Sequence, residues 1–164
     1  MEISNLKTIG LGGGCHWCTE AVFQYLKGVV KVEQGYIKSN GVNDYFSEAV
    51  IVHFDPSIIL LKDLIEIHLH THKSTSNHSF REKYRSAVYY FDENEKQLIE
   101  DILALLQKEF DDLLITSALK FVEFERSRTE LLDYYLNNPE KPFCQKYINP
   151  KLDFLKKKYS KAIK

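Results

Sequence analysis

Two cysteines three residues apart follow a run of glycines near the start of this 164-residue chain. The segment reads Gly12-Gly13-Gly14-Cys15-His16-Trp17-Cys18, and the apolar residues after it have helical spacing. A thiol in the first turn of a helix lies beside unpaired backbone N–H groups and the positive end of the helix dipole, which favour the thiolate. Thiolates are nucleophiles, and glycines leave the backbone open to a substrate. We therefore take Cys15 as the candidate nucleophile, with a buried, space-filling Cys15 as the alternative.

Three kinds of chemistry fit this segment to different degrees. A Cys-x-x-Cys at a helix start is typical of thioredoxin-like disulfide exchangers, in which Cys18 would resolve a mixed disulfide on Cys15, although these proteins usually lack the glycine triplet. A dinucleotide fingerprint fails because Cys15 occupies the place of its last glycine. The third is a reductase whose cysteine attacks a substrate sulfur.

Composition places the chain among ordinary globular proteins, with 44% apolar and 27% charged residues. A net charge of −1 provides no field that attracts nucleic acid or an anionic membrane, and no apolar run has the length of a membrane span. Residues 1–5 do not resemble a secretory leader, so we expect a cytoplasmic protein with no nucleic-acid or membrane partner. The three cysteines, Cys15, Cys18 and Cys144, are then more often catalytic or metal-binding than structural.

The hydropathy pattern predicts strands and helices in alternation over one domain, residues 1–164. The expected strands are 6–11, 29–37, 48–54, 87–91 and 120–124, and the expected helices are 15–26, 58–71, 93–110 and 129–136. Ser57 is the expected cap of the second helix. Because some connections are too short for a crossover helix, we expect a two-layer α+β sandwich with a mixed sheet.

Prolines and asparagines after residue 136 predict a loop over about 137–150 that carries Cys144. The basic tail that follows, 151–164, is expected to be solvated or frayed.

Four histidines, at 68, 70, 72 and 78, are candidate metal ligands. Residues two apart on a helix point in nearly opposite directions, so only His68 and His72 share a face. Two imidazoles without a third ligand make a weak zinc site. We expect packed or solvated histidines and no metal.

The segment Gly14-Cys15-His16-Trp17-Cys18-Thr19-Glu20 resembles the signature of the A-type peptide methionine sulfoxide reductases, usually Gly-Cys-Phe-Trp-Cys-x-Glu. Further matches follow in the family's order at 28–36, 48–56, 84–87 and 138–152, so the resemblance covers about residues 6–155. It implies a ferredoxin-like core with additions, and thiol-dependent reduction of the S epimer of methionine sulfoxide, peptide-bound or free. It also implies a sulfenic acid on Cys15, an intramolecular disulfide, thioredoxin as the reductant and no cofactor.

The chemistry requires an acid, because sulfoxide oxygen is a very poor leaving group until it is protonated. The position that matches the family's acid is Glu48. The sequence supports it independently, since Glu48 shares a strand face with Val50 and Val52, where partial desolvation favours the protonated carboxyl. A strand-end glutamate that points to water is the alternative.

By the same resemblance, Tyr36 and Tyr84 donate hydrogen bonds to the sulfoxide oxygen, and Trp17 holds the substrate methyl; core packing is the alternative for each. This chain departs from the family at several positions. His16 replaces a phenylalanine, which gives the methyl pocket a polar wall or a group that titrates beside the thiolate. Ser79, preceded by His78, replaces an aspartate. These departures indicate a divergent, compact branch.

Two thiols qualify to resolve the sulfenic acid. Cys18 lies almost one helical turn from Cys15, where a rigid helix hinders disulfide geometry. Cys144 lies in the expected loop and matches the family's resolving cysteine, so we favour a Cys15–Cys144 disulfide with Cys18 as the alternative. A thioredoxin-like exchanger and a non-catalytic sulfoxide binder are the competing functions.

Overall fold

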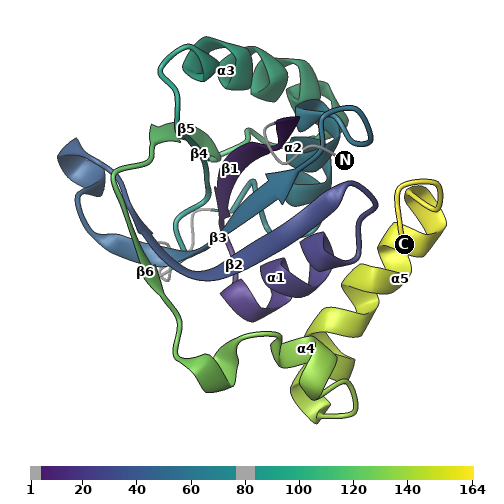
Figure 1. The fold of residues 1–164 in the computed structure, drawn as a ribbon. Coiled ribbons are helices and arrows are strands. Elements are labelled where there is room, and N and C mark those ends of the chain that lie inside the picture. The colour runs from purple at the N-terminus through teal and green to yellow at the C-terminus, as the bar shows by residue number, and fades with distance from the viewer. Residues whose placement is uncertain (1–4, 77–83) are drawn as a thin grey trace.

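The structure is a computed structural model that describes residues 5–76 and 84–164, in which six strands form one sheet (Figure 1). The strands are β1 (Lys7–Gly12), β2 (Val29–Lys38), β3 (Phe46–Phe54), β4 (Ala87–Tyr90), β5 (Ser117–Lys120) and β6 (Glu123–Arg126). The described α-helices are α1 (His16–Gln24), α2 (Leu61–His70), α3 (Glu95–Leu106), α4 (Tyr134–Asn137) and α5 (Asn149–Lys158). Within this part of the chain, no helix has the length and apolar content needed to cross a membrane.

The sheet is mixed and curled. Its strand order is β5-β4-β1-β3-β2-β6, and every neighbouring pair is antiparallel except β4 and β5, which are joined through α3. The edge strands β5 and β6 are connected by Phe121 and Val122 alone, whose N–H groups bond to β4 and β2 respectively. So short a link between the two edges requires the sheet to curl until they approach each other (Figure 1). The expected α+β class with a mixed sheet is confirmed.

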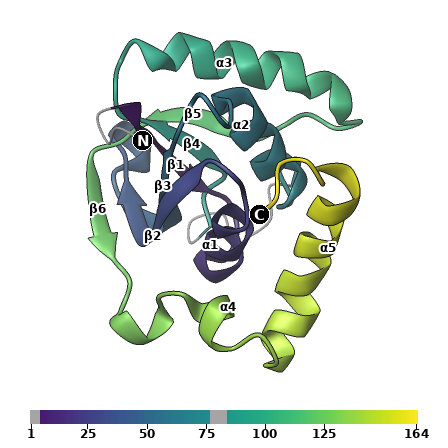
Figure 2. The same cartoon turned by 45° about the vertical axis from the view of Figure 1, so that its right-hand side comes forward.

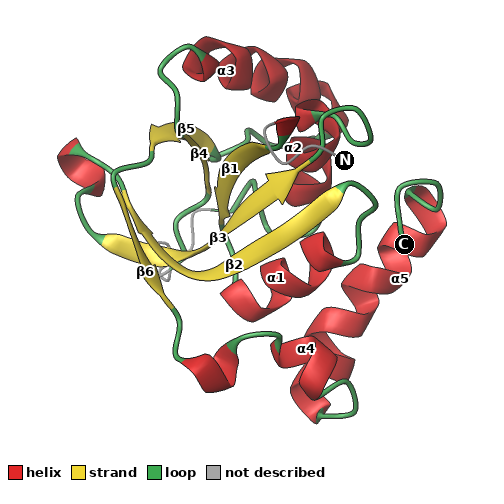
Figure 3. Cartoon of the chain, viewed as in Figure 1, coloured by secondary structure: helices red, strands yellow, loops and turns green. Residues whose placement is uncertain are grey.

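Both faces of the sheet are buried. The main core joins side chains of β1, β3 and β4 to α1, α2, α3 and α5, which surround the strands in Figure 3. Alternation along β3 places Val50, Val52 and Phe54 in this core, whereas Ala49 and Ile51 belong to a smaller cluster on the other face. The face predicted for Glu48 is therefore the face that packs against the helices.

Three element predictions were wrong, one because of distant strand partners and two for local reasons. The expected strand 120–124 is divided between β5 and β6, because its two ends pair with opposite edges of the sheet. The second helix begins at Leu61 and not after a Ser57 cap, because Asp55 Oδ1 accepts bonds from the N–H and hydroxyl of Ser57 at 2.9 and 2.6 Å and holds it in a turn. The expected helix 129–136 is broken at Asp133, whose φ is +53°.

The C-terminal segment differs most from expectation. Instead of a loop, Cys144 begins a π-helical turn, Cys144–Ile148, that runs directly into α5. The tail is not frayed, because Leu152 and Leu155 are buried and Ile163 forms a bridge with Leu26. Figure 2 shows the chain end returning from α5 toward the end of α1. The lysines at 156–158, 161 and 164 are exposed, as expected.

Candidate active site

The glycine turn presents Cys15 at the start of α1. Gly13 has φ +147°, and a Cβ there would lie 2.5 Å from Nε2 of His72, so both its conformation and its surroundings require glycine. His68 Nε2 donates a 2.7 Å hydrogen bond to the carbonyl oxygen of Gly12 and fixes the turn against α2. Cys15 is the N-cap residue, whose carbonyl oxygen accepts the N–H of Cys18 at 3.0 Å. The predicted placement of Cys15 is confirmed.

A cavity of about 360 Å³ opens beside this thiol. It is lined by Cys15, His16, Trp17, Tyr36, Phe46, Glu48, Tyr84, Leu131 and Phe143. Tyr36 and Glu48 are directly opposite each other on β2 and β3, so their side chains point to the same face. The fold thus gathers the predicted nucleophile, acid, tyrosines and tryptophan around one space of the size that ligand pockets have.

Glu48 is 6% exposed, so the alternative of a carboxyl pointing to water is wrong. Its Oε1 accepts the backbone N–H of His16 at 3.2 Å and lies 3.4 Å from Nε2 of the His16 ring. The carboxyl therefore touches the first residue of the helix that carries the nucleophile.

The His16 ring is buried and directed toward Glu48 rather than into open space. Its Nδ1 lies 3.0 Å from the carbonyl oxygen of Gly35, and its plane meets the ring of Tyr36 edge-on at a centroid distance of 5.1 Å. A Cβ on Gly35 would collide with the backbone of Glu125, so glycine lets β6 approach the site. Two roles were expected for His16, a polar wall and a titrating group. The structure shows the first, because His16 forms part of the wall of this cavity.

The apolar wall comes largely from the C-terminal half of the chain. Trp17 stacks on Tyr134 with ring centroids 4.4 Å apart and meets Phe143 edge-on at 5.2 Å. Its buried Nε1 has no hydrogen-bond partner among the described residues. Sequence reasoning did not name Phe46, Leu131 or Phe143 as lining residues. The alternation that placed Glu48 could have found Phe46, two residues before it on β3, whereas no spacing pattern links Leu131 and Phe143 to Cys15.

Arg85 fixes the position of Tyr84. Its backbone N–H donates to Ser47 Oγ at 2.8 Å, and its guanidinium donates to the carbonyl oxygens of Ile37 and Tyr45 at 3.0 and 3.2 Å. The start of β4 is therefore tied to the β2–β3 hairpin that carries Tyr36 and Glu48. The predicted departures at His78 and Ser79 lie outside the described residues.

The two N-terminal thiols form a hydrogen-bonded pair. The bond to Cys18 and then burial raise the pKa of Cys15, and together they outweigh the N–H of Trp17, which lowers it. The bond from Cys15 in turn lowers the pKa of Cys18. The N–H of Trp17 supplies the lowering expected from the helix start, and in the reduced form it acts on two sulfurs that share one proton.

Cys144 is fully buried in the core cluster that also contains Cys18. Burial and then the nearby Cys18 raise the pKa of the Cys144 thiol. The expected loop freedom is absent in this reduced form, because the residue lies in the 144–148 helical turn.

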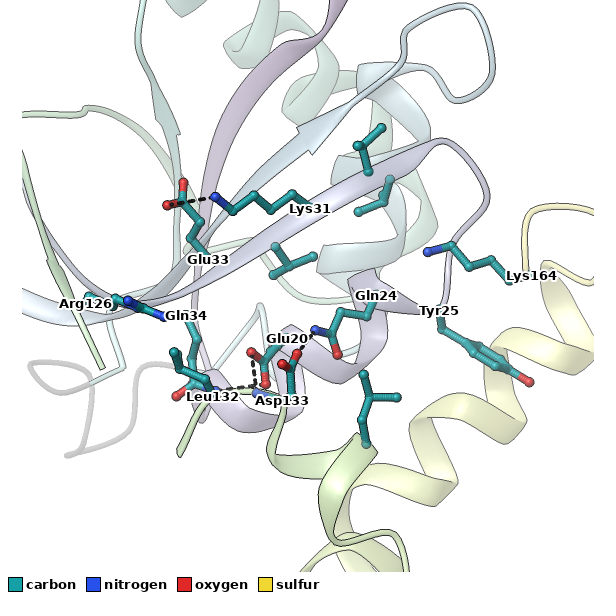
Figure 4. A pocket seen from close by; sticks show the side chains of 14 residues that line it. Glu20, Gln24, Tyr25, Lys31, Glu33, Gln34, Arg126, Leu132, Asp133 and Lys164 are labelled. Carbon is teal, nitrogen blue, oxygen red and sulfur yellow. Dashed lines mark hydrogen bonds and ion pairs between the residues drawn. The ribbon is translucent and has the colours of Figure 1, made fainter. Parts of the chain in front are cut away.

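The remaining histidines serve as packing and hydrogen-bonding groups. His70 pairs with Glu109 at 2.8 Å, and His72 Nε2 lies 2.8 Å from Ser86 Oγ. Across the described ranges, no three groups are arranged to hold a metal ion. Of two larger cavities, the first, of about 1030 Å³, adjoins this site at Gly13, Gly14 and Tyr84 and extends to α5, and the second, of about 760 Å³, lies between α1 and β2 (Figure 4).

Comparison with known proteins gives a consistent result. Residues 7–163 match the sequence profile of the family described as peptide methionine sulfoxide reductase. A peptide methionine sulfoxide reductase MsrA of Sulfolobus acidocaldarius is 32% identical over 156 residues, which cover 87% of this chain and 89% of the relative. The crystal structure of reduced Mxr1 from Saccharomyces cerevisiae has a TM-score of 0.73 at 21% identity and covers 89% of this chain and 93% of that one. Mxr1 in complex with Trx2 aligns with a TM-score of 0.63 at 23% identity over 81% of this chain and 87% of that one.

Proposed function

This chain belongs to the peptide methionine sulfoxide reductase family, and on that premise we propose that it reduces the S epimer of methionine sulfoxide, peptide-bound or free, with Cys15 as the nucleophile. The observation that carries the proposal is the cavity that places Cys15 beside Glu48, Tyr36, Tyr84 and Trp17. We also treat residues 1–164 as one catalytic domain, because α5 and the end of the chain pack on α1. The ferredoxin-like core stays a prediction from the resemblance.

The residues divide the first step between them. The Cys15 thiolate, formed as the shared proton moves to Cys18, attacks the sulfoxide sulfur while Glu48 protonates the oxygen, and an S–S bond forms. The hydroxyl group then passes to the Cys15 sulfur as this S–S bond and the substrate S–O bond break, which leaves a sulfenic acid on Cys15 and releases methionine as a thioether. The cysteine sulfur loses two electrons and the substrate sulfur gains two. The hydroxyls of Tyr36 and Tyr84 donate to the oxygen during transfer, and Trp17 holds the methyl group.

For the second step we propose that Cys144 attacks the sulfenic acid and forms a Cys15–Cys144 disulfide with loss of water. Its burial demands that the π-helical turn 144–148 open first, and such turns are single-turn irregularities that often mark functional sites. Cys18 is the second candidate, favoured by its hydrogen bond with Cys15. Peptide mapping after one turnover without reductant distinguishes the two, since a Cys15–Cys18 bond in the wild type would overturn the first choice.

The disulfide needs an external reductant, and we propose thioredoxin. The support is the yeast protein Mxr1, which has this fold and was crystallised in complex with Trx2. The test is turnover of separated R and S epimers with thioredoxin present. We expect methionine from the S epimer alone, and less than about 1% of that rate after Cys15→Ser, because a hydroxyl supplies almost no anion at neutral pH.

Insulin reduction and sulfoxide binding, measured beside this turnover assay, separate the alternatives. Reduction of insulin disulfides without sulfoxide turnover would indicate a thioredoxin-like exchanger. Binding of sulfoxide without methionine release would indicate a non-catalytic binder. Either result would contradict the proposed function.

A further inference from the structure

The His16 ring is held between two oxygen atoms from neighbouring strands. Nδ1 lies 3.0 Å from the carbonyl oxygen of Gly35, and Nε2 lies 3.4 Å from Oε1 of Glu48. A carbonyl oxygen only accepts hydrogen bonds, so Nδ1 must carry a hydrogen. This assigns the tautomer from the geometry of the partners.

The assignment determines what lies on the other side of the ring. If His16 were neutral and Glu48 ionised, a lone pair of Nε2 would face a lone pair of Oε1, and the two would repel each other. The contact therefore requires one proton, carried either by Nε2 as an imidazolium or by the carboxyl as an acid. Both groups are buried, with 3% and 6% exposure, so the free-energy cost of this contact without the proton is not relieved by water.

We propose that His16 is a positioning residue that shares one proton with Glu48 and keeps that proton in the site at higher pH than Glu48 alone would hold it. The inference rests on the proposed function, in which Glu48 delivers this proton to the sulfoxide oxygen. Two interacting titratable groups lose their protons in two steps that belong to the pair, and the second step lies above that of an isolated carboxyl. The pair therefore extends the acid's working range into neutral and weakly alkaline solution.

The proton balance closes over the catalytic cycle. Each turnover consumes one sulfoxide and two thiols and yields methionine, a disulfide and water. That water takes one proton from Glu48, through the sulfenic acid, and one from the resolving thiol. The proton that Cys15 releases before its attack balances the one that recharges the His16–Glu48 pair.

Several described groups lie around the pair. Cys15 and Cys18 lie at the start of α1, and thiolate formation there produces the acidic limb of a pH–rate profile. Tyr36 from β2 and Tyr84 from the segment before β4 line the same cavity. Ser127, which follows β6 and lies 3.4 Å from Nδ1, does not titrate. The proposal assigns the alkaline limb to the His16–Glu48 pair, and a His16 variant tests that assignment.

A second histidine–glutamate contact provides a matched control. His53 Nε2 lies 2.7 Å from Glu33 Oε2 at the opposite end of β3, about 16 Å from Glu48 at the usual rise per residue. We expect His16→Gln to form sulfenic acid in a single turnover within about threefold of the wild type at pH 6 and about tenfold more slowly at pH 8. The alkaline limb should move down by about one pH unit, while His53→Gln leaves it in place. A constant factor at every pH, or an unchanged profile, would overturn the inference.

A measurement on the wild-type ring does not depend on the folding of a His16 variant. Nitrogen-15 NMR of the histidines should show Nδ1 of His16 protonated throughout the titration. In Glu48→Gln the His16 transition should move to lower pH, because the carboxylate that stabilises the imidazolium is gone. A neutral ring protonated only on Nε2 would contradict the proposal. Failure of the proposed function would appear separately, as a wild type that releases no methionine.

Discussion

Two buried carboxyl groups lie at helix α1: Glu20 belongs to the helix, and Glu48 contacts its first residue. Their surroundings differ. Glu20, in the middle of the helix, is 2% exposed and accepts bonds from Gln34 Nε2 at 2.9 Å and from the backbone N–H groups of Asp133 and Tyr134 at 3.0 and 3.3 Å (Figure 4). Glu48, at the helix start, accepts the N–H of His16, lies beside its imidazole and lines the cavity. Burial alone therefore does not identify an acid.

The fixed donors make the difference. Desolvation raises the pKa of Glu20, but the N–H groups around it need its lone pairs, so the carboxyl serves as an anchor. What it anchors is the segment that ends in Tyr134, whose ring stacks on Trp17 in the active site. Glu48 has a partner that can exchange a proton. Of two carboxyls with similar burial, one holds the aromatic wall and the other is placed to do chemistry.

The largest expected effect separates these roles by rate. Glu48→Gln should slow sulfenic acid formation by roughly 10² to 10⁴, the usual contribution of general acid catalysis. Glu20→Gln should slow it by less than about tenfold, because one amide oxygen still accepts a hydrogen bond. Rapid-quench measurement of methionine release checks both variants. Similar losses of rate in the two variants would contradict the assignment of different roles to Glu48 and Glu20.

Stability should respond in the opposite order. Glu20→Ala leaves the part-buried N–H groups of Asp133 and Tyr134 without their acceptor and leaves the Gln34 amide with the Leu131 carbonyl alone, which costs about 2–4 kcal/mol. Glu48→Gln keeps an acceptor for the His16 N–H and should cost less than about 1 kcal/mol. Urea unfolding of the two variants measures the difference. Equal destabilisation would mean that Glu48 is an anchor as well.

The pH dependence of stability follows from the raised pKa of Glu20. A carboxyl whose pKa is higher in the folded state stabilises the fold fully below its unfolded value, and this contribution is lost as pH rises through the folded value. Relative to Glu20→Gln, which cannot ionise, the wild type should therefore gain stability as pH falls from 7 toward the ordinary value of 4.5. A difference in unfolding free energy that stays constant with pH would contradict the desolvated state of Glu20.

The smallest effect concerns the thiols, which share a proton as His16 and Glu48 do. The bond from Cys15 lowers the pKa of Cys18, so the wild-type pair releases its first proton readily. In Cys18→Ala the buried Cys15 is alone, and the first thiolate should appear about one pH unit higher. Thiolate absorbance measures this, with Cys144→Ala as the control that leaves the first step unchanged. A first step at lower pH in Cys18→Ala would contradict the pairing.

Local patterns predicted much of this site. The glycine turn placed Cys15 at a helix start, and period-two alternation placed Glu48 on the buried face of β3. Both features depend on neighbours a few residues away, which is the range over which sequence patterns act.

Features that depend on distant partners were missed. The division of 120–124 between two strands depends on β4 and β2, which lie elsewhere in the chain. The proline-based loop prediction gave no weight to Cys144, Ile148, Leu152 and Leu155, whose helical spacing packs them into the core. The anchor at Glu20 depends on Asp133, 113 positions away, and nothing near Glu20 indicates it.

The central claim is that Cys15, with Glu48 as the acid, takes the sulfoxide oxygen in a first step that oxidises no other thiol. The most direct test uses the double variant Cys18→Ser, Cys144→Ser, in which Cys15 is the only cysteine. Mixed with the S epimer in the absence of reductant, it should release one methionine per chain and leave a sulfenic acid that dimedone traps on Cys15. No methionine from the folded double variant, or equal release from the R epimer, would contradict the account.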